Sequence, residues 1–228
     1  MKKAIILAFT LLVTLTLNAQ RKVEKTVPVS TNQELFVHFK FAKNIVVKQW
    51  NKKSSEVKAS VNLNNGEGDK YFSLKTSKSN NQVKIHSDFG NYFKSKRNWD
   101  RNNKTEINYI VYVPKNATLK IKSISGSLEI DSFNGSLTTD LISGNITIKK
   151  YNGKMQLKTV SGDVDVTINR AKINAKTVTG TIYSDLNIDK TYSQNKSYSS
   201  KIRGTVNNGS VELKMTTVSG NIYMRKTK

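Results

Sequence analysis

Apolar residues recur at fixed positions through the second half of the chain. Counted from a glycine or alanine that returns every nine residues, the residue two places on is apolar in every copy, and its neighbours are mostly polar. These apolar residues are Leu128, Leu137, Ile146, Met155, Val164, Ile173 and Ile182. Alternation of apolar and polar residues predicts short β-strands with one buried face, separated by bends at the glycines.

The glycines belong to a longer repeat of eighteen residues. They are Gly126, Gly144, Gly162 and Gly180, with the Asn-Gly glycines Gly135 and Gly153 midway between them. Asn-Gly between strands is typical of β-hairpins, so an antiparallel meander is one interpretation. A solenoid with two strands per coil would instead stack each residue on the one eighteen places later, which explains the matching columns. The repeat therefore favours an all-β fold, a single-chain parallel β-solenoid (β-helix) with coils of about 18 residues.

The columns beside the glycines predict which side chains are buried. Ile124, Ile142, Val160 and Val178 are expected to face the core. The hydroxyl residues that flank such positions are expected to form rows on the outside, as in Thr159 with Ser161, Thr177 with Thr179 and Thr217 with Ser219. Ice binding is one hypothesis for outward threonine rows, but the β-propensity of threonine explains them without it.

Three regions follow one another along the chain. Residues 1–19 read as a signal peptide, and residues 20–115 carry longer, more aromatic strands that we expect to act as first coils or as a cap. Residues 116–228 carry the repeats, with an inserted loop at 185–203. We expect the second and third regions to be continuous.

The N-terminal segment predicts export. Lys2 and Lys3 precede an apolar stretch from Ala4 to Leu17, and Ala19 offers a small residue for cleavage, as in a secretory signal peptide. The apolar stretch is shorter than the ~20 residues of a membrane span. The chain contains no cysteine, which excludes disulfides and a lipoprotein anchor. We expect a periplasmic, surface or extracellular protein without a transmembrane segment in the mature chain.

The charge of the chain predicts an anionic partner. Lys and Arg number 38 against 16 Asp and Glu, a net charge of +22, or +20 once the two lysines of the signal segment are removed. Only six of these bases are arginines, which nucleic-acid interfaces favour, and the lysines are spread along the sequence. With export added, we expect no nucleic acid. The expected partner is an anionic polysaccharide, a lipid headgroup or an envelope protein.

The segment VYVPKNATLKIKSISGSLEI, residues 111–130, and the repeats after it resemble a family of exported bacterial proteins described as putative adhesins or β-strand-repeat domains of unknown function. A hydrophobic strand, a proline, a short NATL stretch and serine-glycine repeats occur there in this order. The resemblance covers roughly residues 25 to 226 and implies a parallel β-helix of the cell envelope with an adhesive or stress-related role. It offers no catalytic residues.

No reaction centre is apparent in the sequence. Asp163 and Asp165 share a strand face, but Val164 and Val166 take the inside, so both acids are expected to point to water. His38 and His86 are too few for a structural zinc site. Calcium-binding nine-residue repeats need an aspartate in each unit, and lysines occupy that position in some of the repeats here, which excludes a calcium-binding repeat. We expect no metal, no cofactor and no enzymatic activity.

Two segments that break the repeat carry the candidate binding residues. Both mix aromatic side chains with cations, which together could stack on sugar rings and pair with anionic groups; the alternative is that the aromatics cover the side of the fold. The residues are Phe89, Tyr92, Phe93, Lys94, Lys96, Arg97, Trp99 and Arg101 in the first segment, and Tyr192 and Tyr198 in the second.

Overall fold

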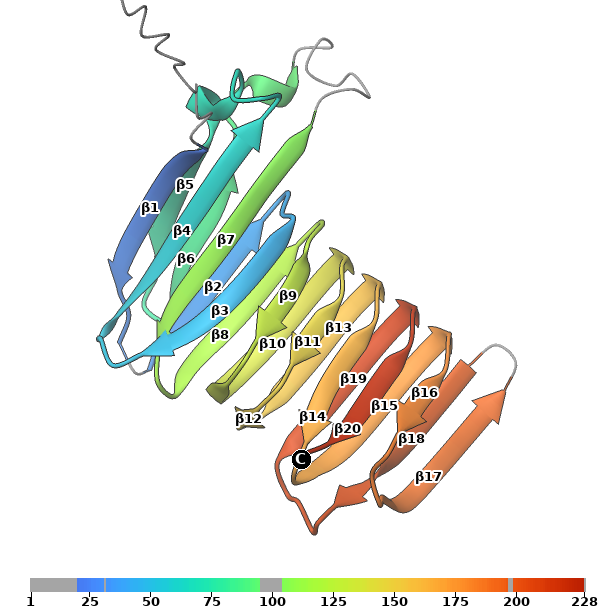
Figure 1. The fold of residues 1–228 in the computed structure, drawn as a ribbon. Helices are drawn as coiled ribbons and strands as arrows, with labels where there is room; N and C mark the ends of the chain where they lie inside the picture. Colours follow the sequence, from blue (N-terminus) through green and yellow to red (C-terminus); the bar gives the residue numbers. More distant parts are fainter. Residues whose placement is uncertain (1–19, 31, 95–103, 197–198, 228) are drawn as a thin grey trace, which may run out of the picture.

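A computed structural model describes residues 20–30, 32–94, 104–196 and 199–227, apart from the side chains of 195 and 196. The predicted signal peptide lies outside these residues. The fold is all-β, as the sequence predicts, and consists of two open sheets packed face to face around one continuous hydrophobic core (Figure 1).

The first sheet has nine strands. In spatial order they are β1 (Arg21–Pro28), β4 (Ser54–Leu63), β7 (Thr105–Pro114), β3 (Asn44–Trp50), β9 (Ser127–Ile130), β11 (Ile146–Ile148), β14 (Val164–Ile168), β20 (Ile222–Lys226) and β16 (Ile182–Ser184).

The second sheet has eleven strands. In spatial order they are β17 (Asp189–Lys196), β18 (Ser199–Val206), β15 (Ala171–Thr179), β19 (Glu212–Ser219), β13 (Met155–Ser161), β10 (Phe133–Ser143), β8 (Ala117–Ser123), β2 (Glu34–Phe39), β6 (Gln82–Asp88) and β5 (Ser73–Lys78), while β12 (Tyr151–Asn152) pairs with β10. Two short 3-10 helices, η1 (Asp69–Tyr71) and η2 (Tyr92–Lys94), lie near the N-terminal end of the stack.

Strands of the repeat region pair in parallel with their counterparts in the next repeat. Leu137 on β10 pairs with Leu119 on β8 and with Met155 on β13, each eighteen residues away. The same offset relates Ile146 on β11 to Leu128 on β9 and to Val164 on β14. The repeat strands therefore do not form the antiparallel meander that the Asn-Gly turns also allowed.

The order of strand pairs in space differs from their order in sequence at two places. The last pair, β19 with β20, lies between β13 with β14 and β15 with β16, so the red strands of Figure 1 separate two orange pairs. Likewise, β2 with β3 lies between β6 with β7 and β8 with β9. The expected stacking of Gly180 on Gly162 is therefore wrong, because Gly220 lies between them.

The residues beside the corner glycines face the opposite way from the prediction. Ile124, Ile142, Val160, Val178 and Val218 are all exposed by 37% or more. The side chains of Ser123, Leu141, Thr159, Thr177 and Thr217 are fully buried instead. The threonines tolerate burial because each hydroxyl donates to a glycine carbonyl of the neighbouring strand pair, at 2.8 to 3.0 Å. Ser161, Thr179 and Ser219 remain exposed, but without the buried threonines they do not form the outward Thr-x-Ser/Thr rows on which the ice-binding hypothesis depends.

Antiparallel strands close both ends of the stack. At the N-terminal end β4 pairs with β7, β1 with β4, and β5 with β6. At the other end β18 pairs with β15, and β17 with β18. Residues 185–203, expected to be a loop, thus contribute most of a β-hairpin, because pairing satisfies the free edge of β15 that a loop would leave open.

Candidate binding surface

The outer face of the eleven-stranded sheet gathers basic side chains from segments far apart in the sequence. Along each strand, buried and outward residues alternate, so only every second residue reaches this face. Paired residues share a face, so Lys84, Phe36 and Lys120 lie side by side on β6, β2 and β8. The basic face, as we call it, comprises Lys84, Lys120, Lys122, Lys158, Lys172, Lys176, Lys201, Arg203 and Lys214.

Acidic residues on the basic face are fewer. Asp88, Asp140 and Glu212 are engaged in ion pairs, Glu34 accepts a hydrogen bond from Nε2 of Gln82 at 2.8 Å, and Asp189 has no ion pair among the described residues. Asp140 lies 3.4 Å from the Nζ of Lys158 and 3.8 Å from that of Lys122. The Lys154 ammonium, 2.9 Å from Glu212, lowers the pKa of that carboxyl by hydrogen bonding. Within the described residues, no ion pair involves the basic-face residues Lys84, Lys120, Lys172, Lys176, Lys201, Arg203 and Lys214. The face therefore carries an excess of uncompensated positive charge.

The nine-stranded sheet has a more balanced outer face. Lys58 pairs with Glu24 at 3.2 Å, and Arg225 pairs with Asp165 at 2.6 Å. The excess positive charge among the outward sheet residues is thus concentrated on the opposite side of the molecule.

The two carboxylates considered for acid-base chemistry have structural partners on this nine-stranded sheet. Asp165 holds the guanidinium of Arg225 in a bidentate pair, with N to O distances of 2.6 to 2.9 Å. Asp163 accepts the backbone N–H of Asn221 at 2.7 Å. Both interactions tie β14 to the strand pair inserted beside it.

An aromatic ring lies within the basic face. The half-buried ring of Phe36 has the ammonium of Lys84 at 5.4 Å from its centroid and that of Lys120 at 5.3 Å. The ring of His38 stacks parallel to it at 6.0 Å. Cations over an aromatic face attract it electrostatically, and a flat ring beside cations suits a sugar that carries an anionic group. Phe36 was missed in the sequence, although its position between the inward Leu35 and Val37 marks it as outward.

The two histidines lie next to each other on this face. His38 and His86 are directly paired across β2 and β6. Burial, followed by the charge of Lys84, lowers the pKa of both imidazoles. Among the described residues, no group of three or more His, Cys, Asp or Glu could hold a metal ion. The pair is therefore neutral at pH 7 and gains charge only in more acidic solution.

The first predicted binding segment is only partly exposed. Phe89 and Tyr92 are 3% and 5% exposed, so their assignment as binding residues is wrong and the alternative, that these aromatics cover the fold, holds for them. They are buried because they pack with Phe72 and Phe93 in a cluster of aromatic rings that closes the end of the core. Lys94 is exposed. Four of the predicted residues lie outside the described residues: Lys96, Arg97, Trp99 and Arg101.

The second segment keeps one exposed aromatic. Tyr192 is 42% exposed, and the ammonium of Lys201 lies 5.5 Å from its ring centroid. Pairing of β17 with β18 places Tyr192 opposite Arg203, at the end of the basic face. Tyr198 lies outside the described residues. The hairpin thus extends the basic face instead of forming a separate loop site.

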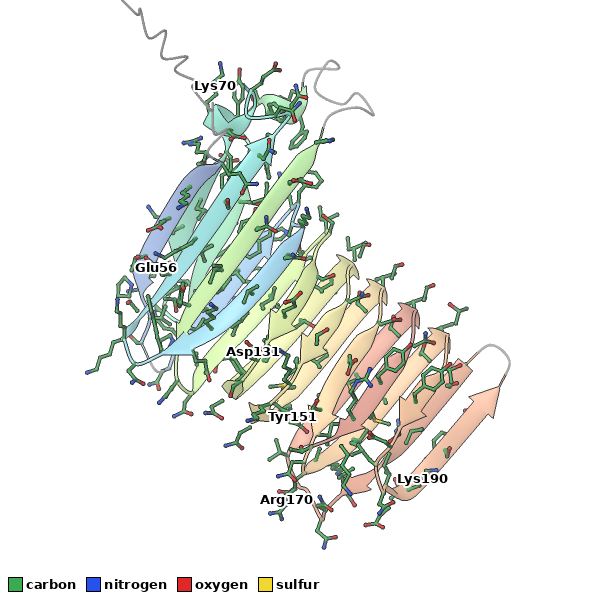
Figure 2. The ribbon with its side chains drawn as sticks, in the orientation of Figure 1. Glu56, Lys70, Asp131, Tyr151, Arg170 and Lys190 are labelled. Atoms are coloured by element: carbon green, nitrogen blue, oxygen red, sulfur yellow. The ribbon has the colours of Figure 1, made fainter. Side chains whose placement is uncertain are left out.

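The long edge formed by the Asn-Gly turns carries further polar side chains. Asp131, Tyr151 and Arg170 follow one another along it in Figure 2. The Tyr151 hydroxyl donates to the carbonyl of Arg170 at 3.5 Å, and burial raises the pKa of this phenol above its usual range. Tyr151 therefore remains neutral, and its hydrogen bond links two neighbouring turns.

Two sheets, parallel repeat strands and glycine corners stacked on one another place this fold among the β-repeat proteins that the sequence resembles. Residues 115–225 match the model of the Toastrack DUF4097 family. The match confirms the resemblance to adhesin-like domains of unknown function for the repeat region. In the DUF4097 segment lie β8 to β20, and with them most of the basic face. No curated protein matches the sequence.

Three solved structures match this chain at low sequence identity, and one of them has a TM-score above 0.5. A protein from Clostridium sporogenes, described as a putative cell adhesion protein, matches 91% of this chain and 100% of its own, with a TM-score of 0.56 and 11% identity. A putative adhesin from Bacteroides fragilis matches 92% and 99%, with a TM-score of 0.29 and 13% identity. A putative lipid binding protein from Parabacteroides distasonis matches 91% and 97%, with a TM-score of 0.20 and 12% identity. The Clostridium protein supports the fold alone.

Across the described ranges, no helix has the length and apolar character needed to cross a membrane.

Proposed function

We propose that this protein is an exported, non-enzymatic parallel β-solenoid, with coils of about 18 residues, that binds an anionic polysaccharide of the cell envelope across its basic face. The observation that carries the proposal is the one-sided distribution of unpaired lysines. Export is supported by the signal-peptide pattern of residues 1–19. The description of the Clostridium protein as a putative cell adhesion protein agrees with a surface role.

A polymer suits the geometry of the basic face better than a small anion. Neighbouring strands lie about 4.8 Å apart, so outward lysines recur at short intervals across the sheet. A single exposed ion pair contributes only about 0.2 to 1 kcal/mol. Several such ion pairs made together by one chain add up, because the later ones form within a complex that already exists. Useful affinity therefore requires a ligand that presents many negative charges in a row.

The chemistry of the face favours a glycan over a nucleic acid. Arg203 is its only described arginine, whereas bidentate phosphate contacts favour arginine. Phe36 and Tyr192 provide aromatic rings beside cations, an arrangement that can contact both the apolar face and the charged group of an acidic sugar.

The test is binding of residues 20–228 to an acidic polysaccharide, compared with a neutral polysaccharide of similar length and with vesicles of anionic lipid. We expect binding to the acidic polysaccharide only, and at least a tenfold loss of affinity between 0.05 and 0.5 M salt, because screening shortens from about 14 Å to about 4 Å. Equal affinity for the neutral polymer, or affinity unchanged by salt, would overturn the proposal. Preference for the vesicles would reassign the partner to a lipid surface.

An alternative is a structural or stress-response envelope component that binds another protein, and one observation favours it. The exposed aliphatic residues beside the glycine corners form a continuous ladder across five strand pairs: Ile124, Ile142, Val160, Val218 and Val178. Exposed apolar ladders of this kind are typical of protein contacts. Retention of one stoichiometric envelope protein that no longer binds after Ile142→Thr with Val160→Thr, with no retained glycan, would support this alternative.

A further inference from the structure

A second binding feature lies at the N-terminal end of the molecule, away from the basic face. Three chain connections meet there: β1 to β2, β3 to β4, and β7 to β8. They enclose a cleft of about 630 Å³, within the range of about 300 to 1,000 Å³ typical of sites for small ligands. Its lining combines the apolar side chains of Pro28, Val29 and Trp50 with the exposed lysines Lys52, Lys53 and Lys115.

Trp50 is held in one orientation at this cleft. Its indole Nε1 donates to the carbonyl of Ser54 at 2.7 Å. Its ring stacks on Tyr112, with centroids 5.0 Å apart and planes within 22°. Because Trp50 ends β3 on the outward side of the sheet, it remains partly exposed instead of entering the core. A fixed, accessible aromatic ring loses little conformational entropy when a ligand stacks on it.

The walls of the cleft are also held by hydrogen bonds. The side chain of Gln33 accepts the backbone N–H of Ser30 at 3.2 Å and donates to the carbonyl of Asn80 at 3.1 Å. The backbone N–H of Lys115 donates to the carbonyl of Trp50 at 3.3 Å. The Lys115 bond joins the β7–β8 connection to the β3–β4 connection, and the backbone N–H of Val29 joins the β1–β2 connection to it by donating to the carbonyl of Lys53 at 3.5 Å. Gln33 ties the β1–β2 connection to the turn between β5 and β6. The cleft is therefore formed without a ligand.

The charge around the cleft has one sign. Lys52, Lys53 and Lys115 are exposed, and the ammonium of Lys52 lies 4.6 Å from the Trp50 ring centroid. Among the described lining residues there is no carboxylate. The cleft therefore attracts an anion, while the indole and proline rings in its lining favour an apolar ring face.

We propose that the cleft binds a single acidic sugar residue, a pyranose ring that carries a carboxylate or a phosphate. The apolar face of the sugar packs on the face of Trp50 that the Lys52 ammonium covers in the free protein, so Lys52 moves aside, and the anionic group is held by Lys53 and Lys115. The inference rests on the proposed function in one respect: the same acidic polysaccharide supplies the sugar as a chain end or branch. The cleft would thus bind one sugar residue, in addition to the polymer bound across the basic face.

Tryptophan fluorescence isolates this site. The chain has two tryptophans, Trp50 and Trp99, so Trp99→Phe leaves Trp50 as the only reporter. We expect a saturable change in emission with glucuronic acid or glucose 6-phosphate, and none with glucose or with sodium acetate at the same ionic strength. The response to the two acidic sugars distinguishes a carboxylate ligand from a phosphate ligand.

Charge variants distinguish the cleft from general attraction. Lys53→Gln with Lys115→Gln should weaken the response at least tenfold, whereas Lys48→Gln with Lys150→Gln, exposed lysines that do not line the cleft, should leave it unchanged. Absence of any emission change with either acidic sugar overturns the inference, even where the acidic polysaccharide still binds the basic face. An equal response to acetate, or an equal loss in both variants, overturns it as well. If the sugar binds and the polysaccharide does not, the proposed function fails and the cleft stands.

Discussion

Gly162 occupies a corner where two strand pairs stack, and its replacement by alanine tests that stacking directly. Its backbone has φ +148°, a region that residues with a Cβ rarely adopt. A Cβ added there would lie 2.2 Å from the carbonyl oxygen of Gly144 and 2.6 Å from its carbonyl carbon. These are backbone atoms of the neighbouring strand pair, so the clash cannot be relieved by rotating a side chain.

The expected cost of Gly162→Ala combines two contributions. The backbone conformation costs about 1 to 3 kcal/mol for a residue other than glycine, and forcing apart packed backbone costs about 1 to 3 kcal/mol more. A total of about 3 kcal/mol corresponds to a melting temperature lower by roughly 6 to 12 °C in a protein of this size.

Gly90→Ala provides the matched control. Gly90 also has a positive φ, of +50°, but a Cβ there would meet nothing within 4 Å. Gly90→Ala should therefore lose only the backbone contribution, about 1 kcal/mol, which lowers the melting temperature by roughly 2 to 4 °C. Thermal unfolding followed by circular dichroism measures both variants. Equal melting temperatures for the two would refute the close stacking of the glycine corners.

Two substitutions test which corner residues face the core. Thr217→Val should lower the free energy of unfolding by about 1 kcal/mol, because a buried glycine carbonyl loses its hydrogen-bond donor. Val218→Thr, at the exposed neighbour, should change it by less than about 0.5 kcal/mol. Urea unfolding distinguishes the two, and the reverse order would restore the facing expected from the sequence. Burial and the charge of Lys84 lower the pKa of His38 and His86 in the folded protein. As the pH falls below about 6.5, the unfolded chain therefore binds protons before the folded protein does. The free energy of unfolding decreases from that pH down to the lowered pKa values of the folded protein. His38→Gln with His86→Gln should flatten this decrease between pH 7 and 5, and an unchanged pH profile would exclude the pair as its source.

The sequence was sufficient to predict the strands and their parallel stacking in the repeat region. A nine-residue alternation ending in glycine needs a neighbour with the same pattern to cover it, which is why Leu119, Leu137 and Met155 form one ladder. The order of the strand pairs was not predictable in this way. The corners at Gly180 and Gly220 follow nearly identical residues, so either could stack on Gly162, and the period alone does not choose between them.

The facing of the corner residues was available in the sequence but was misread. Strict alternation from Met155 through Leu157 places Thr159 inside and Val160 outside, as observed. The prediction followed the hydrophobicity of valine instead. Hydrophobicity failed there because a glycine carbonyl satisfies the buried hydroxyl, which removes the cost of burying it.

The candidate site could be predicted only in part. The positive charge and the need for an anionic partner follow from composition, but the lysines seemed scattered because residues such as Lys84 and Lys120 meet only once the strands are paired. Phe89 and Tyr92 lie in a segment that breaks the repeat, and the sequence leaves two interpretations of them open, a binding loop and a cover for the side of the fold. A segment that closes the end of a stack also needs aromatic residues, so composition alone does not separate a lid from a binding loop.

Binding of an acidic polysaccharide by two charge-reversal variants tests the central claim most directly. Lys120→Glu with Lys214→Glu changes the basic face, and Lys22→Glu with Lys48→Glu makes the same change in net charge on the opposite sheet. Each ion pair with the polymer that is removed, and each repulsion that is introduced, should weaken binding by about 0.2 to 1 kcal/mol. The first variant should therefore bind at least about tenfold more weakly, and the second less than about threefold more weakly. Equal weakening in the two variants would show that net charge alone, and not the basic face, governs binding.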